Sequence, residues 1–142
     1  MPPEEERRGR ALYSGMAASL YRLRYVFDYG GGCLWGDNEA AKDRFGYAID
    51  PIALPLSPET VAHIAQVSAW YDTSLNWEYP PDPGPWRQEE CARFNMAART
   101  LHTDIARALG LTFVVRDEQS PVRENPDLDA YLRDPAHFWR TP

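Results

Sequence analysis

One short segment, residues 21–28, restricts the fold more than any other feature of this sequence. Every second residue there is large and apolar: Tyr21, Leu23, Tyr25 and Phe27. This period of two is typical of a β-strand with one face in the core and the other toward solvent. Gly30, Gly31 and Gly32 follow, and residues without Cβ end a strand and permit a tight turn. We therefore expect a sheet built around this strand.

Two long helices are predicted between residues 57 and 110. Ser57 is a suitable N-cap, and Pro58 suits the first position of the helix that follows. A longer helix is predicted over residues 87–109, where Gly110 provides the stop. Apolar side chains recur in it every three or four residues: Cys91, Phe94, Ala98, Leu101, Ile105 and Ala108. These side chains are expected to face the core.

Shorter elements are predicted between the first strand and these helices. Residues 33–35 can return as the second strand of a hairpin. Asp37 or Asn38 can cap a short helix over residues 39–45, and Gly46 can end it in a left-handed conformation. A helix of that length depends on tertiary packing.

Leu111–Val115 has the composition of another strand, so the predicted fold class is α/β (α+β). A small sheet would include the N-terminal strand or hairpin and the C-terminal strand, covered by the two long helices. Residues 21–118 would form a single domain, after a partly disordered N-terminal segment over residues 1–20. The tail over residues 119–142 can dock on the domain through its apolar side chains, Tyr131, Leu132, Phe138 and Trp139.

The charge balance restricts the classes of partner. The chain has 21 acidic and 15 basic residues, and its net charge of −6 argues against binding to nucleic acid or to an anionic membrane. The same charge suits a basic protein partner. Lys42 is the single lysine among the basic residues, an imbalance typical of GC-rich bacterial genomes. No apolar run approaches the length of a membrane span, and we expect a cytoplasmic protein.

No motif for catalysis stands out. Asp28, Asp37 and Cys33 flank or follow the glycine turn and are weak candidates for acid–base or nucleophilic chemistry. Cys33 is expected to be more exposed than Cys91, which lies on the helical stripe. The histidines fall on three separate segments: His63, His102 and His137. No ligand spacing typical of zinc is present, so neither a metal site nor a cofactor is predicted.

A proline-rich loop over residues 77–86 has the strongest binding signal. Rings and carboxylates alternate there among four prolines: Trp77, Glu78, Tyr79, Asp82 and Trp86. Rigid aromatic side chains are good anchors for a protein partner, and carboxylates beside them can attract a basic one. In the other interpretation the rings cover the end of the helical layer as part of the core.

These features favour a protein-binding module, with an immunity or antitoxin-like inhibitor of a basic enzyme as the specific hypothesis. The alternative is a small enzyme or small-molecule-binding protein. Its pocket would lie between the glycine turn and the proline-rich loop, lined by Tyr25, Trp35, Trp77 and Tyr79. A third hypothesis is a subunit that forms homo-oligomers through exposed aromatic side chains.

Three stretches of the chain carry a resemblance to other proteins: FDYGGGCLWGDNEAA, LPLSPET and WYDTSLNWEYPPDPGPW. They resemble segments of small uncharacterised acidic proteins of GC-rich bacteria. The resemblance covers roughly residues 21–118. It implies a compact bacterial domain and carries over no activity and no catalytic residue.

Overall fold

The predicted first strand is β1, Tyr21–Asp28, and it is the central strand of a three-stranded sheet in the computed structural model, which describes residues 20–140. The glycine turn leads into β2, Gly32–Gly36, which pairs antiparallel with β1. On the other side of β1 lies β3, Phe113–Asp117, in parallel orientation. A parallel neighbour requires a crossover connection, and the two long helices provide it. The structure confirms the predicted fold class.

The alternation in β1 determines which face of the sheet is covered. Leu23, Tyr25 and Phe27 are buried beneath the long helices, as the period of two predicts. On β2, Leu34 lies opposite Tyr25 in the register and is equally buried. One sheet face therefore forms one wall of the core, and the buried side chains of the two long helices form the other.

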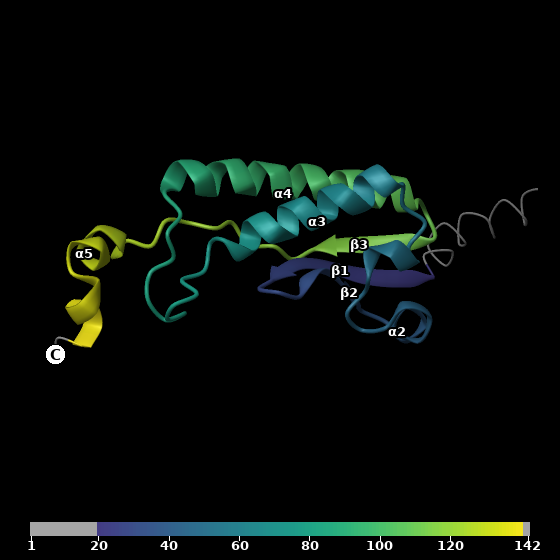
Figure 1. Ribbon diagram of the computed structural model, residues 1–142. Helices are drawn as coiled ribbons and strands as arrows, with labels where there is room; N and C mark the ends of the chain where they lie inside the picture. Colours follow the sequence, from purple (N-terminus) through teal and green to yellow (C-terminus); the bar gives the residue numbers. More distant parts are fainter. Residues whose placement is uncertain (1–19, 141–142) are drawn as a thin grey trace, which may run out of the picture.

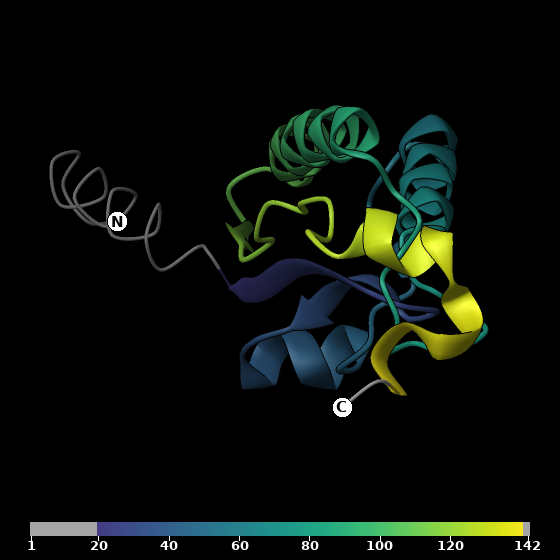
Figure 2. The same cartoon turned by 90° about the vertical axis from the view of Figure 1, so that its left-hand side faces the viewer.

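Helices α3, Pro58–Asp72, and α4, Gln88–Leu109, run along this face of the sheet (Figure 1). The short helix α2, Glu39–Phe45, lies on the opposite side of the sheet in both views (Figure 2). Asn38 caps α2 and Ser57 caps α3 through their side chains, as predicted. Within residues 20–140, no helix is long and apolar enough to cross a membrane.

The apolar stripe of α4 is confirmed except at its C-terminal end. Phe94, Leu101 and Ile105 are fully buried. Ala108 is exposed, and Leu109 takes the buried position in its place. The physical reason is that a stripe repeating every seven residues drifts by about 20° per repeat on a helix of 3.6 residues per turn. After two repeats, Leu109, four positions beyond Ile105, therefore faces the core better than Ala108, three positions beyond it.

The chain continues after β3 into α5, Leu128–Arg133, and a 3₁₀ helix, Pro135–Arg140. Leu128 is buried, and the Asn76 side chain in the proline-rich loop donates a hydrogen bond to the Tyr131 hydroxyl. This part of the tail therefore supports the loop. The predicted N-terminal segment falls outside the described residues apart from Leu20, as does the side chain of Trp139.

Candidate functional site

The proline-rich loop joins α3 to α4, and its C-terminal end is part of the core. Trp86 is only 4% exposed, and its ring packs 5.7 Å from that of Trp70 and 5.2 Å from that of Phe94, measured between centroids. Its indole N–H donates to the Thr73 hydroxyl at 2.9 Å. A buried indole with a satisfied N–H is a structural anchor, so this end of the loop covers the helical layer.

The middle of the loop is held in one conformation. The Asn76 side-chain oxygen accepts hydrogen bonds from the backbone N–H groups of Glu78 and Tyr79, both at 3.1 Å. At Gly84 the loop passes so close to the Ser74 carbonyl oxygen that a Cβ would overlap it. Only glycine fits this close approach. The rings that the loop presents are therefore fixed in position before any partner binds.

Burial narrows the set of loop residues that a partner can reach. Asp82 is buried together with Trp86, and one of its carboxylate oxygens has no hydrogen-bond partner among the described residues. Trp77, Glu78 and Tyr79 are exposed. The two interpretations of the loop thus apply to different parts of it: one end belongs to the core, and the other faces solvent.

Trp77 belongs to a larger group of aromatic and acidic side chains. Its ring is 59% exposed and lies edge-on to Tyr29, which in turn stacks on Tyr71 at 4.6 Å between centroids. The indole N–H of Trp77 donates to the Asp72 carbonyl oxygen at 2.6 Å, so the ring carries no unsatisfied polar group. We call this group the aromatic–acidic surface: Tyr29, Tyr71, Asp72, Trp77 and Glu78.

The glycine turn contributes Tyr29 to this surface, and the end of α3 contributes Tyr71 and Asp72. The sequence did not predict that Tyr29 joins them. Asp72 accepts a hydrogen bond from the Gly30 backbone N–H at 3.0 Å and so ties the hairpin turn to α3. The Tyr29 hydroxyl and the Ser74 hydroxyl are hydrogen-bonded at 3.3 Å. Tyr29 directly precedes the glycines, but only tertiary contacts bring it to Trp77, 48 positions later in the sequence.

The negative charge is concentrated in the segment that contributes this surface. Residues 25–86 hold nine of the 21 acidic residues but only two of the 15 basic ones, Lys42 and Arg44. The formal charge of the segment is thus 2 − 9 = −7, against −6 for the whole chain. Between positions 45 and 86 there is no lysine or arginine at all. The rest of the chain, with 21 − 9 = 12 acidic and 15 − 2 = 13 basic residues, is nearly neutral.

The weak catalytic candidates do not come together. Asp28 ends β1, whereas the Asp37 backbone N–H donates to the Arg22 carbonyl oxygen near the start of that strand. The strand from Arg22 to Asp28 spans about 20 Å, so Asp28 and Asp37 lie at opposite ends of β1. Asp37 is bound instead to Arg116, at 2.8 Å. An acid–base pair between these carboxylates, with Cys33 between them, is excluded by this geometry.

Cys33 lies in the core, which corrects the expectation of an exposed thiol in the glycine turn. The residue is 2% exposed because β2 begins immediately after the turn and directs the side chain toward α3. Burial raises the pKa of the thiol from 9.0 to about 12, and the nearby Ser68 hydroxyl offsets a smaller part of the rise. The pKa of Cys91 is also raised, and burial is the largest cause. Neither thiol is activated as a nucleophile.

Replacing Cys33 by alanine is expected to reduce the loss of stability in alkaline solution. The folded chain keeps this thiol protonated. Its contribution to the free energy of unfolding is therefore full below pH 9 and falls as the pH rises toward 12. The slope is about 1.4 kcal/mol per pH unit. Between pH 8 and pH 10.5, wild type should therefore lose about 2 kcal/mol more than Cys33→Ala in urea denaturation. Equal losses would show that the thiol is not held in its neutral form.

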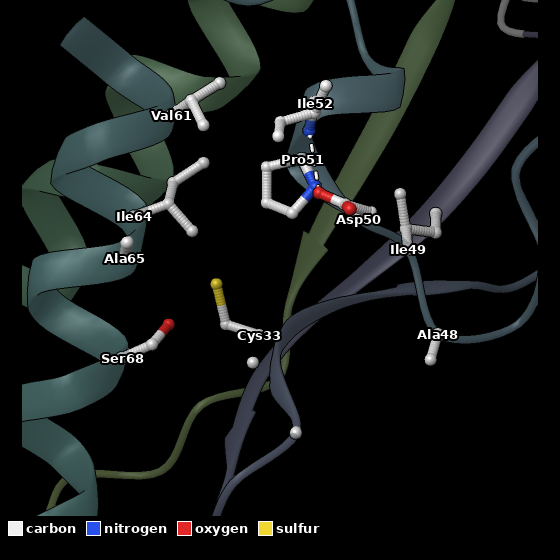
Figure 3. Close-up of a pocket in the computed structure, with 12 residues that line it drawn as sticks. Cys33, Ala48, Ile49, Asp50, Pro51, Ile52, Val61, Ile64, Ala65 and Ser68 are labelled. Carbon is white, nitrogen blue, oxygen red and sulfur yellow. Dashed lines mark hydrogen bonds between the residues drawn. The ribbon is translucent and has the colours of Figure 1, made fainter. Parts of the chain in front are cut away.

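A cavity of about 450 Å³ lies next to the glycine turn, between α3 and residues 48–52 (Figure 3). The proline-rich loop does not line it, which corrects the predicted position of a pocket. The four residues expected to share a pocket are also separated. The Tyr25 hydroxyl donates to the Ala98 carbonyl oxygen in the core, and Trp35 lines a hollow with Arg24 on the other sheet face.

Comparison with known protein families gives a match. A model of a protein family described as Serratia CdiI immunity protein-like matches residues 21–117. The matched region begins at the first residue of β1 and ends at the last residue of β3, so it includes the whole sheet, both long helices and the aromatic–acidic surface. No curated protein matches the chain.

Proposed function

Because the chain belongs to the Serratia CdiI immunity protein-like family, whose model covers more than half of it, we propose that it is an inhibitor that binds a toxin protein through the aromatic–acidic surface. The observation that carries the choice of surface is the contact between Trp77 and Tyr29. It joins the exposed end of the proline-rich loop to the glycine turn and makes one continuous binding area.

The rings of this surface are suited to a high-affinity contact. Trp77 is held by its N–H bond to Asp72, and Tyr29 is held by stacking on Tyr71. Large side chains that are already fixed lose little conformational entropy when a partner covers them. Tryptophan and tyrosine are for this reason enriched among the residues that dominate binding energy.

The toxin is expected to present a basic surface to this inhibitor. Glu78 is exposed next to Trp77 in the chain, and the segment that holds both carries most of the negative charge of the chain. Opposite charges on the two proteins would speed their encounter and exclude acidic partners. A toxin that acts on nucleic acid would present such a basic surface, since it must bind phosphate groups.

Reconstitution with the partner toxin tests the proposed function. A cell that makes the toxin must also make its inhibitor, so the protein encoded beside this chain is the first candidate for the toxin and the one to produce. The two purified proteins should form a stable 1:1 complex in size-exclusion chromatography, and the toxin in the complex should lose its activity. A neighbouring protein that is toxic and yet neither binds nor is inhibited would contradict the proposal.

Glu78→Gln is expected to slow association with the toxin while leaving the dissociation rate nearly unchanged. Glu78 is an exposed carboxylate at the rim of the surface, and rim charges mainly steer encounter. The decrease in association rate with increasing salt should also become less steep. Surface plasmon resonance at two ionic strengths measures both effects. Asp104→Asn, which removes an exposed carboxylate from α4, is the control and should change neither. Faster dissociation of Glu78→Gln at an unchanged association rate would argue against steering.

A further inference from the structure

The cavity beside the glycine turn has a mostly apolar wall and a small polar floor. Its lining comes mainly from α3 and from the segment around the 3₁₀ helix η1, Pro51–Ala53: Ile49, Pro51, Ile52, Val61, Ile64 and Ala65. The Cys33 thiol and the Ser68 hydroxyl point into it (Figure 3). Within the described residues, the buried Ser68 oxygen has no hydrogen-bond partner of normal geometry. A cavity of this size and composition suits an uncharged, largely apolar group.

The lining holds two ionisable groups, the exposed Asp50 carboxylate and the buried Cys33 thiol. Asp50 is the one ionisable carboxylate there, and its side-chain oxygen already accepts a hydrogen bond from the Ile52 backbone N–H at 3.0 Å. Burial keeps the Cys33 thiol neutral. An ammonium or guanidinium group placed against Cys33 and Ser68 would therefore lose its hydration without gaining a charged partner there.

The cavity and the aromatic–acidic surface share two elements, α3 and the glycine turn. Along α3, Ile64 and Ser68 line the cavity, and Tyr71 and Asp72 follow on the surface. Eight residues of helix, from Ile64 to Asp72, span about 12 Å. In the glycine turn, Gly31 lines the cavity while its neighbour Gly30 is bonded to Asp72. A protein of ordinary interface size that covers the surface would also cover the cavity.

We propose that the cavity receives an apolar side chain of the bound toxin, an aliphatic or aromatic group that projects from the toxin's basic surface. This inference rests on the proposed function, because it assigns a second contact to the same interface. Charge complementarity identifies the partner. Positions 45–86, which supply most of the lining, contain no lysine or arginine that would repel a basic toxin. An apolar group inserted into a pocket beside aromatic anchors is a common basis of high affinity.

Ala65→Trp tests the inference by filling the cavity from its wall. Ala65 lines the cavity but is itself exposed, so the larger side chain can be accommodated without displacing the core. Ala62→Trp is the matched control, because Ala62 is exposed on the same helix and is not part of the lining. With the toxin encoded beside the chain as the probe, calorimetry should show at least tenfold weaker binding for Ala65→Trp and less than a twofold change for Ala62→Trp. Both variants should keep the melting temperature of the wild type. If Ala65→Trp lowers it, Ala65→Leu is used in its place.

Binding of Ala65→Trp within twofold of the wild type would overturn the inference. If Trp77→Ala weakens binding in the same experiment, the proposed function stands and only the cavity assignment fails; if neither variant has an effect, the proposed surface fails as well. Two further measurements identify other occupants. A small molecule retained by the wild type in native mass spectrometry and lost from Ala65→Trp would overturn the inference. A dimer that sedimentation detects in the wild type and not in Ala65→Trp would also do so.

Discussion

Replacing Phe94 by alanine is expected to lower the free energy of unfolding by about 3–5 kcal/mol, the largest effect of any single truncation in this core. Phe94 is fully buried on α4. Its ring contacts four others at centroid distances of 5.2 to 5.5 Å: Phe27, Trp70, Tyr71 and Trp86. The alanine variant would leave a cavity where the sheet, both long helices and the proline-rich loop meet.

Urea denaturation followed by circular dichroism measures this loss, provided that the slope of the transition is unchanged. Met96→Ala is the control, because Met96 is two residues away on the same helix and its side chain is 64% exposed. It should change stability by no more than about 0.5 kcal/mol. A loss below about 1 kcal/mol for Phe94→Ala would show that the position of α4 over the sheet is wrong.

Trp77→Ala is expected to weaken binding to the toxin by at least about 2 kcal/mol, which corresponds to roughly thirtyfold in Kd. The ring is exposed in the free protein and would be covered in the complex, so its truncation removes a large apolar contact. The fold should be little affected, because the side chain lies on the surface of the loop. Isothermal titration calorimetry with the toxin measures the effect.

Tyr47→Ala is the matched control for Trp77→Ala. The two rings are similarly exposed, at 57% and 59%, but Tyr47 packs against Trp35 on the other side of the sheet. We expect its truncation to change the Kd by less than twofold. The opposite result would be a loss of roughly thirtyfold for Tyr47→Ala and no loss for Trp77→Ala. It would show that the toxin binds the opposite face of the sheet.

The sequence predicted the fold well because its local signals agree with the tertiary structure. The alternation over residues 21–28 predicted strand β1, and the predicted cap at Ser57 is the one that the structure shows. Of the two predicted caps for α2, Asp37 and Asn38, the structure shows Asn38. The parallel order of β1 and β3 follows from the helices between them. The family match confirms the predicted function as a protein-binding immunity-like chain.

The site was less predictable, because tertiary contacts decide which rings are exposed. Trp77 and Trp86 have similar proline-rich surroundings in the sequence, yet Trp86 packs on α4 while Trp77 faces solvent. Tyr29 and Asp72 join the surface only because the glycine turn meets the end of α3. Cys33 could not be placed from its glycine neighbours, since its burial depends on α3 packing over β2.

Growth of bacteria that produce the toxin is the most direct test of the central claim, that this chain neutralises a toxin through its aromatic–acidic surface. The toxin is expressed alone, with the wild-type chain, with Trp77→Ala or with Tyr47→Ala, and the level of each chain is verified by immunoblot. The account predicts normal growth with the wild type and with Tyr47→Ala, and growth arrest at limiting expression of Trp77→Ala. Arrest in the presence of the wild-type chain, or full protection by Trp77→Ala at every expression level, would contradict it.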